Sequence, residues 1–103
     1  MQWVGMFPFV GANYITIRLP MQLQPLSGGS STIEVEAATV IDALDAVAKS
    51  YPAVGRAIQT ENGTIRAHVS VFVNREHIGL RQGERTELQP GDVVTILPSI
   101  TGG

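Results

Sequence analysis

Apolar residues recur with a helical period in one segment of this chain and with a strand-like pattern in several others. Residues 39–51 place apolar side chains three and four positions apart, whereas the remaining segments alternate or form short apolar runs. A period near 3.6 buries one face of a helix, and a period of two buries one face of a sheet. The order along the chain, strand, strand, helix, strand, strand, therefore requires one sheet face to be buried against one main helix.

The strand segments also indicate which side chains face the core. We predict strands at 14–19, 32–36, 67–74 and 93–97, with a short edge strand at 76–78. The inward side chains, taken from the alternation, are Ile15, Ile17, Leu19, Ile33, Val35, Val69, Val71, Val73, Val94 and Ile96.

The helix has recognisable start and stop signals. Thr39 is a good N-cap residue, and Asp42 follows three positions later, close to a capping box. Asp45 and Lys49 are spaced to pair on the outer face, and Pro52 ends the helix. The predicted apolar face consists of Ile41, Leu44, Val47, Ala48 and Tyr51.

Glycine and proline residues indicate where loops and turns connect the predicted strands and helix. Residues 20–31 are predicted to be a long loop, residues 53–62 a mixed segment with at most one further helical turn, and Asn62-Gly63 a tight turn. With these connections, the first and last strands would run parallel in the middle of a mixed four- to five-stranded sheet. This α+β roll is the β-grasp, or ubiquitin-like, fold.

Length and composition are those of one globular domain. The chain has 103 residues, 44% hydrophobic and 16% charged, enough to bury one core without disulfides or metals. We predict the folded domain over 13–98 and a flexible tail over 99–103. Residues 1–12 are predicted to be a loosely ordered apolar extension, too short to span a membrane and without the positive region of a signal peptide.

The last residues follow a turn, a strand and a proline. Residues 90–92, Pro-Gly-Asp, predict the turn, and Pro98 follows the apolar run 93–97. Because glycine has no Cβ, Gly102 and Gly103 could enter a narrow channel in another protein. The pattern predicts that the terminal carboxylate of Gly103 is the reactive group. The alternative is that the C-terminal residues are merely frayed.

Composition and spacing disfavour other kinds of site. The chain has no cysteine, which excludes a disulfide or a cysteine metal site. Its net charge is −2 and its seven Lys and Arg residues are scattered, which argues against a nucleic-acid partner. His68 and His77 lack the spacing of a metal site. Asp42 and Asp45 fit the first turns of a helix, and Gly28-Gly29 lacks the lysine of a phosphate-binding loop. We expect no catalytic residue and no bound metal or cofactor.

Three stretches together resemble the ThiS/MoaD-type ubiquitin-like sulfur carriers. They are residues 71–74 (Val-Phe-Val-Asn), 91–98 (Gly-Asp-Val-Val-Thr-Ile-Leu-Pro) and 101–103 (Thr-Gly-Gly). The likeness covers most of residues 13–103.

Two further stretches are most similar to the branch that serves cysteine biosynthesis, the CysO-type carriers. They are the glycine- and proline-containing segment 19–29 and residues 65–69, Ile-Arg-Ala-His-Val. Molybdopterin-synthase small subunits share the C-terminal part but not this loop. Residues 1–12 depart from the family pattern.

The resemblance implies a protein cosubstrate rather than an enzyme. A ThiF/MoeB-like adenylating enzyme would bind Ile100, Thr101 and Gly102 and use its own ATP to adenylate the Gly103 carboxylate. A sulfur source would displace AMP and leave a thiocarboxylate, which a second enzyme would use to build sulfur into a metabolite. For cysteine, the implied partners are a PLP-dependent cysteine synthase and a JAMM-type metallopeptidase. A cytoplasmic location follows from the same resemblance.

A docking surface is predicted beside the tail. If the inward set above is correct, Phe72, Val93 and Leu97 lie on the open face of the sheet, where apolar side chains suit partner binding. The alternative is that residues 1–12, with their aromatic side chains, fold over this face.

Three functions stay open from the sequence. The first is the sulfur carrier, and the second is a protein modifier joined to lysines through the activated Gly103. The third is a β-grasp interaction domain that needs no activation. The pathway also stays open, because cysteine, thiamine, molybdopterin and tRNA thiolation all use carriers of this shape.

Overall fold

The computed structural model describes residues 13–98, and it contains one mixed five-stranded sheet in the order β2-β1-β5-β3-β4. The predictions made for residues 1–12 and 99–103 lie outside the described residues. The strands are β1 (Tyr14–Arg18), β2 (Thr32–Glu36), β3 (Val69–Val73), β4 (Glu76–His77) and β5 (Val93–Pro98).

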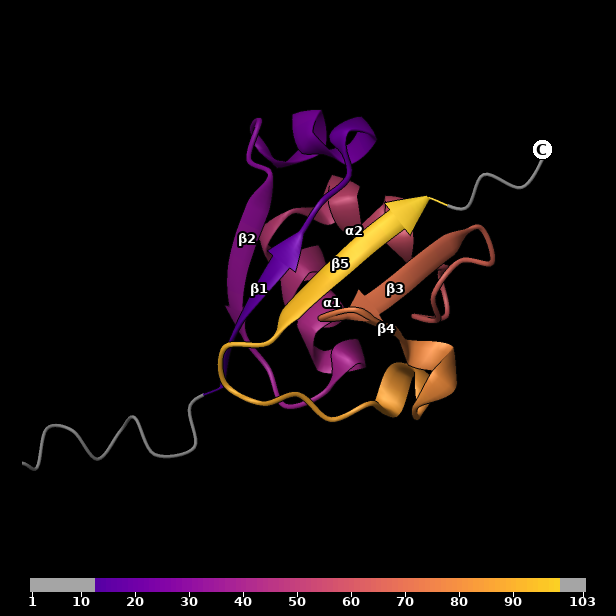
Figure 1. The fold of residues 1–103 in the computed structure, drawn as a ribbon. Helices are drawn as coiled ribbons and strands as arrows, with labels where there is room; N and C mark the ends of the chain where they lie inside the picture. The colour runs from indigo at the N-terminus through magenta and orange to yellow at the C-terminus, as the bar shows by residue number, and fades with distance from the viewer. Residues whose placement is uncertain (1–12, 99–103) are drawn as a thin grey trace, which may run out of the picture.

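The helices α1 (Val40–Ser50) and α2 (Pro52–Ile58) both lie on one side of the sheet, behind it in Figure 1. Three short 3₁₀ segments complete the described elements: η2 (Met21–Ser27), η3 (Ile78–Leu80) and η4 (Gly83–Arg85). The other face of the sheet carries no helix within the described residues. This is the α+β arrangement that the sequence predicts.

The central pair of strands is parallel, as predicted. β1 pairs with β5 from Thr16 opposite Val93 to Arg18 opposite Thr95, and every other pairing in the sheet is antiparallel. A parallel neighbour requires a long crossover, and the chain between β1 and β5 contains both helices. The predicted strand 32–36 has the same bounds as β2, and the other strand boundaries differ by at most two residues, with β3 beginning at Val69.

The core lies between the inner sheet face and α1. All ten side chains predicted to point inward do so, and nine are buried, while Val69 is partly buried against the same cluster. Leu44 of α1 is 1% exposed and packs at the centre of this layer. Buried residues between and beyond the strands complete the core: Ala37, Val40, Ala43, Val47, Val54, Ile58, Ile78 and Leu88.

The cap of α1 is as predicted, but its apolar face is rotated. The Thr39 Oγ1 accepts a hydrogen bond from the Asp42 backbone N–H at 3.2 Å. The buried positions are Val40, Ala43, Leu44 and Val47, whereas Ile41, Ala48 and Tyr51 are only half-buried. A second helix lies beside this face, at Ala48. A Cβ built on Gly55 of α2 would lie 2.4 Å from the Ala48 Cβ, so Ala48 contacts α2.

The predicted ion pair between Asp45 and Lys49 is wrong. Asp45 Oδ1 instead accepts a hydrogen bond from the Nε2 of Gln59, which is buried just after α2, at 3.0 Å. A partner fixed by tertiary packing replaces the exposed lysine, whose long side chain loses entropy when it pairs.

Two segments predicted as loop or mixed structure contain more order than expected. η2 lies inside the predicted loop and is capped at its C-terminal end by Gly28, whose φ is +74°. Ser27 is buried, and its Oγ contacts the carbonyl oxygens of Gln24 and Ser30 at 3.0 and 2.9 Å. α2 begins directly at Pro52, where a missing N–H costs nothing in a first turn.

Leu44→Ala should lower the free energy of unfolding by about 2–5 kcal/mol, because it opens a cavity in the centre of the core. Asp42→Ala, on the exposed side of the same helix, should cost about 1 kcal/mol or less, since its backbone N–H still reaches Thr39. Urea unfolding of the two variants measures both values. Equal losses would contradict this placement of the helix face.

Candidate functional site

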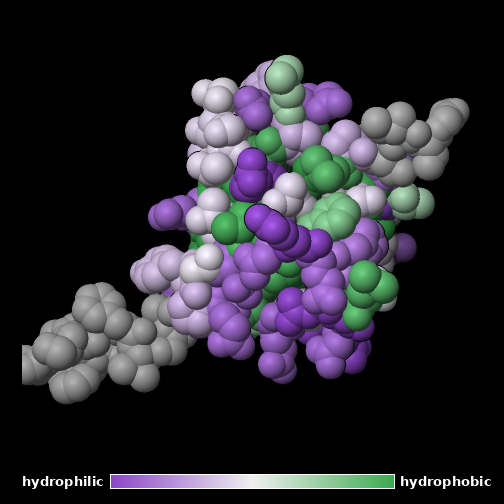
Figure 2. Space-filling view, viewed as in Figure 1, coloured by the Kyte–Doolittle hydropathy of each residue, from purple (hydrophilic) through white to green (hydrophobic). Residues whose placement is uncertain are grey.

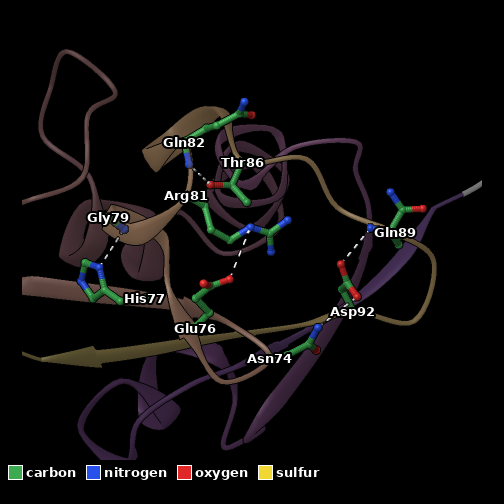
Figure 3. A network of polar contacts seen from close by, with 9 residues as sticks. All are labelled: Asn74, Glu76, His77, Gly79, Arg81, Gln82, Thr86, Gln89 and Asp92. Carbon is green, nitrogen blue, oxygen red and sulfur yellow. Dashed lines mark hydrogen bonds and ion pairs between the residues drawn. The ribbon is translucent and has the colours of Figure 1, made fainter.

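The strand that leads to the C-terminus begins at a network of side-chain and backbone hydrogen bonds. Asn74 Oδ1 accepts from the Val93 N–H at 3.1 Å, and its Nδ2 donates to Asp92 Oδ1 at 3.2 Å. The Asn74 N–H donates to the Val93 carbonyl at 2.7 Å. Figure 3 shows the side chain of Asn74, just after β3, facing that of Asp92, just before β5. The start of β5 is therefore fixed to the end of β3.

Two backbone positions make this network possible. Asn74 has a φ of +58°, the only positive φ of a non-glycine residue in the described chain, and asparagine tolerates this conformation better than most residues. Gly91, in the turn before β5, has a φ of +88°. Asp92 Oδ2 accepts from the Gln89 N–H at 2.8 Å and closes that turn.

At its other end, β5 stays paired as far as the structure describes it. Val69 of β3 lies opposite Pro98, the last described residue. β1 and β5 run in the same direction, so their C-terminal ends lie at the same end of the sheet (Figure 1). The residues predicted to enter the activating enzyme, Ile100, Thr101, Gly102 and Gly103, follow this end and lie outside the described residues.

The three residues predicted for docking share the open face. Phe72 lies opposite Thr95, the residue between Val93 and Leu97 on that face, so it is a diagonal neighbour of both. Leu97 is 43% exposed, whereas Phe72 and Val93 are half-buried. The structure thus brings together Phe72, Val93 and Leu97, and we call these three residues the open-face patch.

The open-face patch is surrounded by polar and charged residues. Arg18 of β1 lies opposite Thr95, and the His77 ring packs edge-on against Phe72 with ring centroids 5.2 Å apart. Figure 2, which views this face, shows hydrophobic side chains set among hydrophilic ones. The contact between His77 and Phe72 could not be predicted from the sequence, because it depends on the pairing of β3 with β4.

Two of the side chains considered for metal binding or catalysis, His77 and Asp45, make structural hydrogen bonds. His77 Nδ1 accepts from the Gly79 N–H at 2.8 Å, while His68 is exposed near the start of β3. Within residues 13–98, no three histidine or acidic side chains are grouped closely enough to hold a metal ion. No helix in that range is long and apolar enough to cross a membrane.

A family model matches residues 17–103, a range that includes the whole sheet beyond the start of β1 and the two final glycines. The chain belongs to the ThiS family. This confirms the predicted resemblance to ThiS/MoaD-type ubiquitin-like carriers.

Individual relatives agree with the family and the fold. The sulfur carrier protein CysO of Mycobacterium tuberculosis is 26% identical over 91 residues, covering 86% of this chain and 98% of the relative. Small archaeal modifier protein 1 of Haloferax volcanii is 36% identical over 78 residues, covering 73% of this chain and 85% of the relative.

The structure of an Amycolatopsis orientalis BexX/CysO complex contains a chain with the same fold. It superimposes with a TM-score of 0.76 at 29% identity, covering 86% of this ThiS-family chain and 99% of that chain. The fold is the β-grasp, and the family comprises sulfur carriers and ubiquitin-like modifiers.

Asn74→Gly should lower the stability of this ThiS-family chain by about 0.5–1.5 kcal/mol, because it removes the side-chain hydrogen bonds to β5 and keeps the positive φ. Asn74→Ala should cost about 1–2 kcal/mol more, because alanine is strained in the left-handed region. Chemical denaturation of both variants gives the comparison. If glycine and alanine were equally destabilising, the backbone conformation at position 74 would not matter.

Proposed function

We propose that this chain is a sulfur carrier whose Gly103 carboxylate is adenylated and then converted to a thiocarboxylate. The folded domain supplies a recognisable surface and holds the start of the tail. It supplies no catalytic side chain to either step. The chain is then a protein cosubstrate, and the ATP is bound by the partner enzyme.

The chemistry divides into two steps. A Gly103 carboxylate oxygen attacks the α-phosphorus of ATP, which forms an acyl-adenylate and releases pyrophosphate. The sulfur of a sulfide-level donor then attacks the acyl carbon, AMP leaves with the bridging oxygen, and a thiocarboxylate remains. Both steps need an unhindered carbonyl carbon, and glycine is the residue that crowds it least.

The observation that carries the proposal is the reach of the family match, which continues past β5 to residue 103. A likeness limited to the fold would support only a β-grasp scaffold, since a fold does not by itself specify a function. Here the match includes the Gly-Gly end. The CysO relative, a sulfur carrier by name, also spans 86% of this chain.

The partner of the first step is expected to be a ThiF/MoeB-like adenylating enzyme. The open-face patch defined above is its proposed docking surface, because Val93 and Leu97 lie on the strand that leads into the tail and Phe72 lies beside them on β3. For the second step we favour cysteine biosynthesis, on the likeness to CysO carriers, with a PLP-dependent cysteine synthase as acceptor. A JAMM-type metallopeptidase would then release the product, and these steps would take place in the cytoplasm.

A second candidate is a protein modifier, and the 36% identity to small archaeal modifier protein 1 favours it. The activation step would be the same. The two functions differ in the nucleophile that attacks the acyl-adenylate or a derived ester, because a modifier is transferred to a lysine amine. One chain could serve both functions.

Deleting Gly102 and Gly103 should abolish adenylation, measured as pyrophosphate release by a ThiF/MoeB-like enzyme with ATP. The melting temperature should fall by less than about 4 °C, equivalent to under 1 kcal/mol for a domain of this size, because the core lies within residues 13–98. A chain extended by one residue beyond Gly103 is the matched control and should also be inactive. Full activity of either variant would contradict a role for the Gly103 carboxylate.

Phe72→Ala should weaken binding to the activating enzyme by about 1–3 kcal/mol, as for an aromatic anchor at an interface. Val71→Ala is the matched control on the same strand, where Val71 is 1% exposed and faces the core. It should lower stability by about 1–3 kcal/mol and leave the affinity of the folded fraction nearly unchanged. Titration calorimetry and thermal melts separate the two effects, and the reverse pattern would place the docking surface elsewhere.

A further inference from the structure

A cavity of about 260 Å³ opens beside the last described residue of β5. It lies between η2, α2 and the adjoining ends of β3 and β5, and its lining is mostly apolar. The space is large enough for a branched side chain, since one water occupies roughly 30 Å³ of the liquid. The apolar lining residues are Pro20, Leu23, Ala57, Val69, Ile96 and Pro98.

Two basic side chains add a second kind of recognition to this cavity. Arg66 and His68 both contribute to the lining, and no acidic residue does. Arg66 Nε donates to the Arg56 carbonyl at 2.9 Å, which fixes the direction of the guanidinium. Within residues 13–98 the one ion pair joins Arg81 to Glu76, so no described carboxylate pairs with Arg66. The cavity therefore suits a ligand that combines an apolar group with an anion.

The residues that follow Pro98 include an apolar side chain and, after it, the terminal carboxylate. Ile96 and Pro98 both line the cavity, whereas Leu97 between them is exposed on the opposite face. If the alternation of β5 continued past Pro98, Ile100, the one large apolar residue of 99–103, would face the same side. Three further residues end in a carboxylate and can reach about 10 Å.

We propose that this cavity binds the chain's own C-terminal segment, with Ile100 on the apolar lining and the Gly103 carboxylate at Arg66 and His68. Covalent attachment gives the segment a high effective concentration, so weak contacts suffice. The two glycines allow the backbone to turn toward the basic side chains.

The consequence for activity rests on the function proposed above. A docked tail is withheld from the activating enzyme, so the apparent affinity for that enzyme equals the intrinsic affinity multiplied by the fraction of molecules whose tail is released. The same pocket would cover the thiocarboxylate after sulfur transfer, because it has the same charge as the carboxylate.

Backbone amide NMR of the full chain tests the docking directly. Ile100→Asp should shift the amide signals of Ala57, Arg66 and His68, which are distant from position 100 in the sequence. Ser99→Asp is the matched control: it introduces the same charge one residue closer to the domain but on the alternate side. It should shift those three signals much less.

Three results would overturn the proposal. One is no change at Ala57 and Arg66 in Ile100→Asp, and another is an equal change in Ser99→Asp. The third is dependence of the wild-type signals on protein concentration, because the occupant would then be a second copy of the chain. The experiment contains no enzyme, ATP or sulfur, so its failure would leave the sulfur-carrier function standing, and failure of adenylation would leave the docking result standing.

Discussion

The position of β5 between β1 and β3 is the constraint on which the rest of the structure depends. The last strand in sequence is paired on both edges, parallel to the first strand and antiparallel to β3. Its inner face, Val94 and Ile96, is at most 1% exposed and faces the helix layer. Buried backbone groups must be hydrogen-bonded, so a strand in this position cannot leave without disrupting both halves of the sheet. The C-terminal residues therefore follow a strand that is paired on both edges and buried on its inner face.

The local pattern of apolar and polar residues was sufficient to predict the strands and the start of α1. Alternation identified the inward residues correctly, and a threonine followed by an aspartate three positions later marked a cap that the hydrogen bond to Thr39 confirms. The order of elements was enough to predict the parallel central pair. The open-face positions of Phe72, Val93 and Leu97 then followed, because a period of two assigns each residue to one face of the sheet.

What the sequence could not reveal depends on contacts between distant segments. The face of α1 was predicted with an error in rotation, since Val40 and Ala43 are buried where Ile41 and Ala48 were expected, and nothing local shows that Gly55 of a second helix packs against Ala48. Asp45 is bonded to Gln59, fourteen residues away, rather than to the lysine one turn on. The pairing of Asn74 with Asp92, and the meeting of Pro20, Arg66 and Pro98 around one cavity, are likewise products of the fold.

The central claim is that the reactive group of this ThiS-family chain is its own C-terminus, and intact-mass spectrometry tests it most directly. The purified chain would be incubated with ATP, sulfide and a ThiF/MoeB-like enzyme, with ATP omitted from the control. The account predicts an ATP-dependent mass increase equal to the difference between sulfur and oxygen, located by fragmentation at Gly103. The account would be contradicted by an unchanged mass, provided that the same enzyme converts its own carrier under the same conditions. A sulfur atom located elsewhere in the chain would also contradict it.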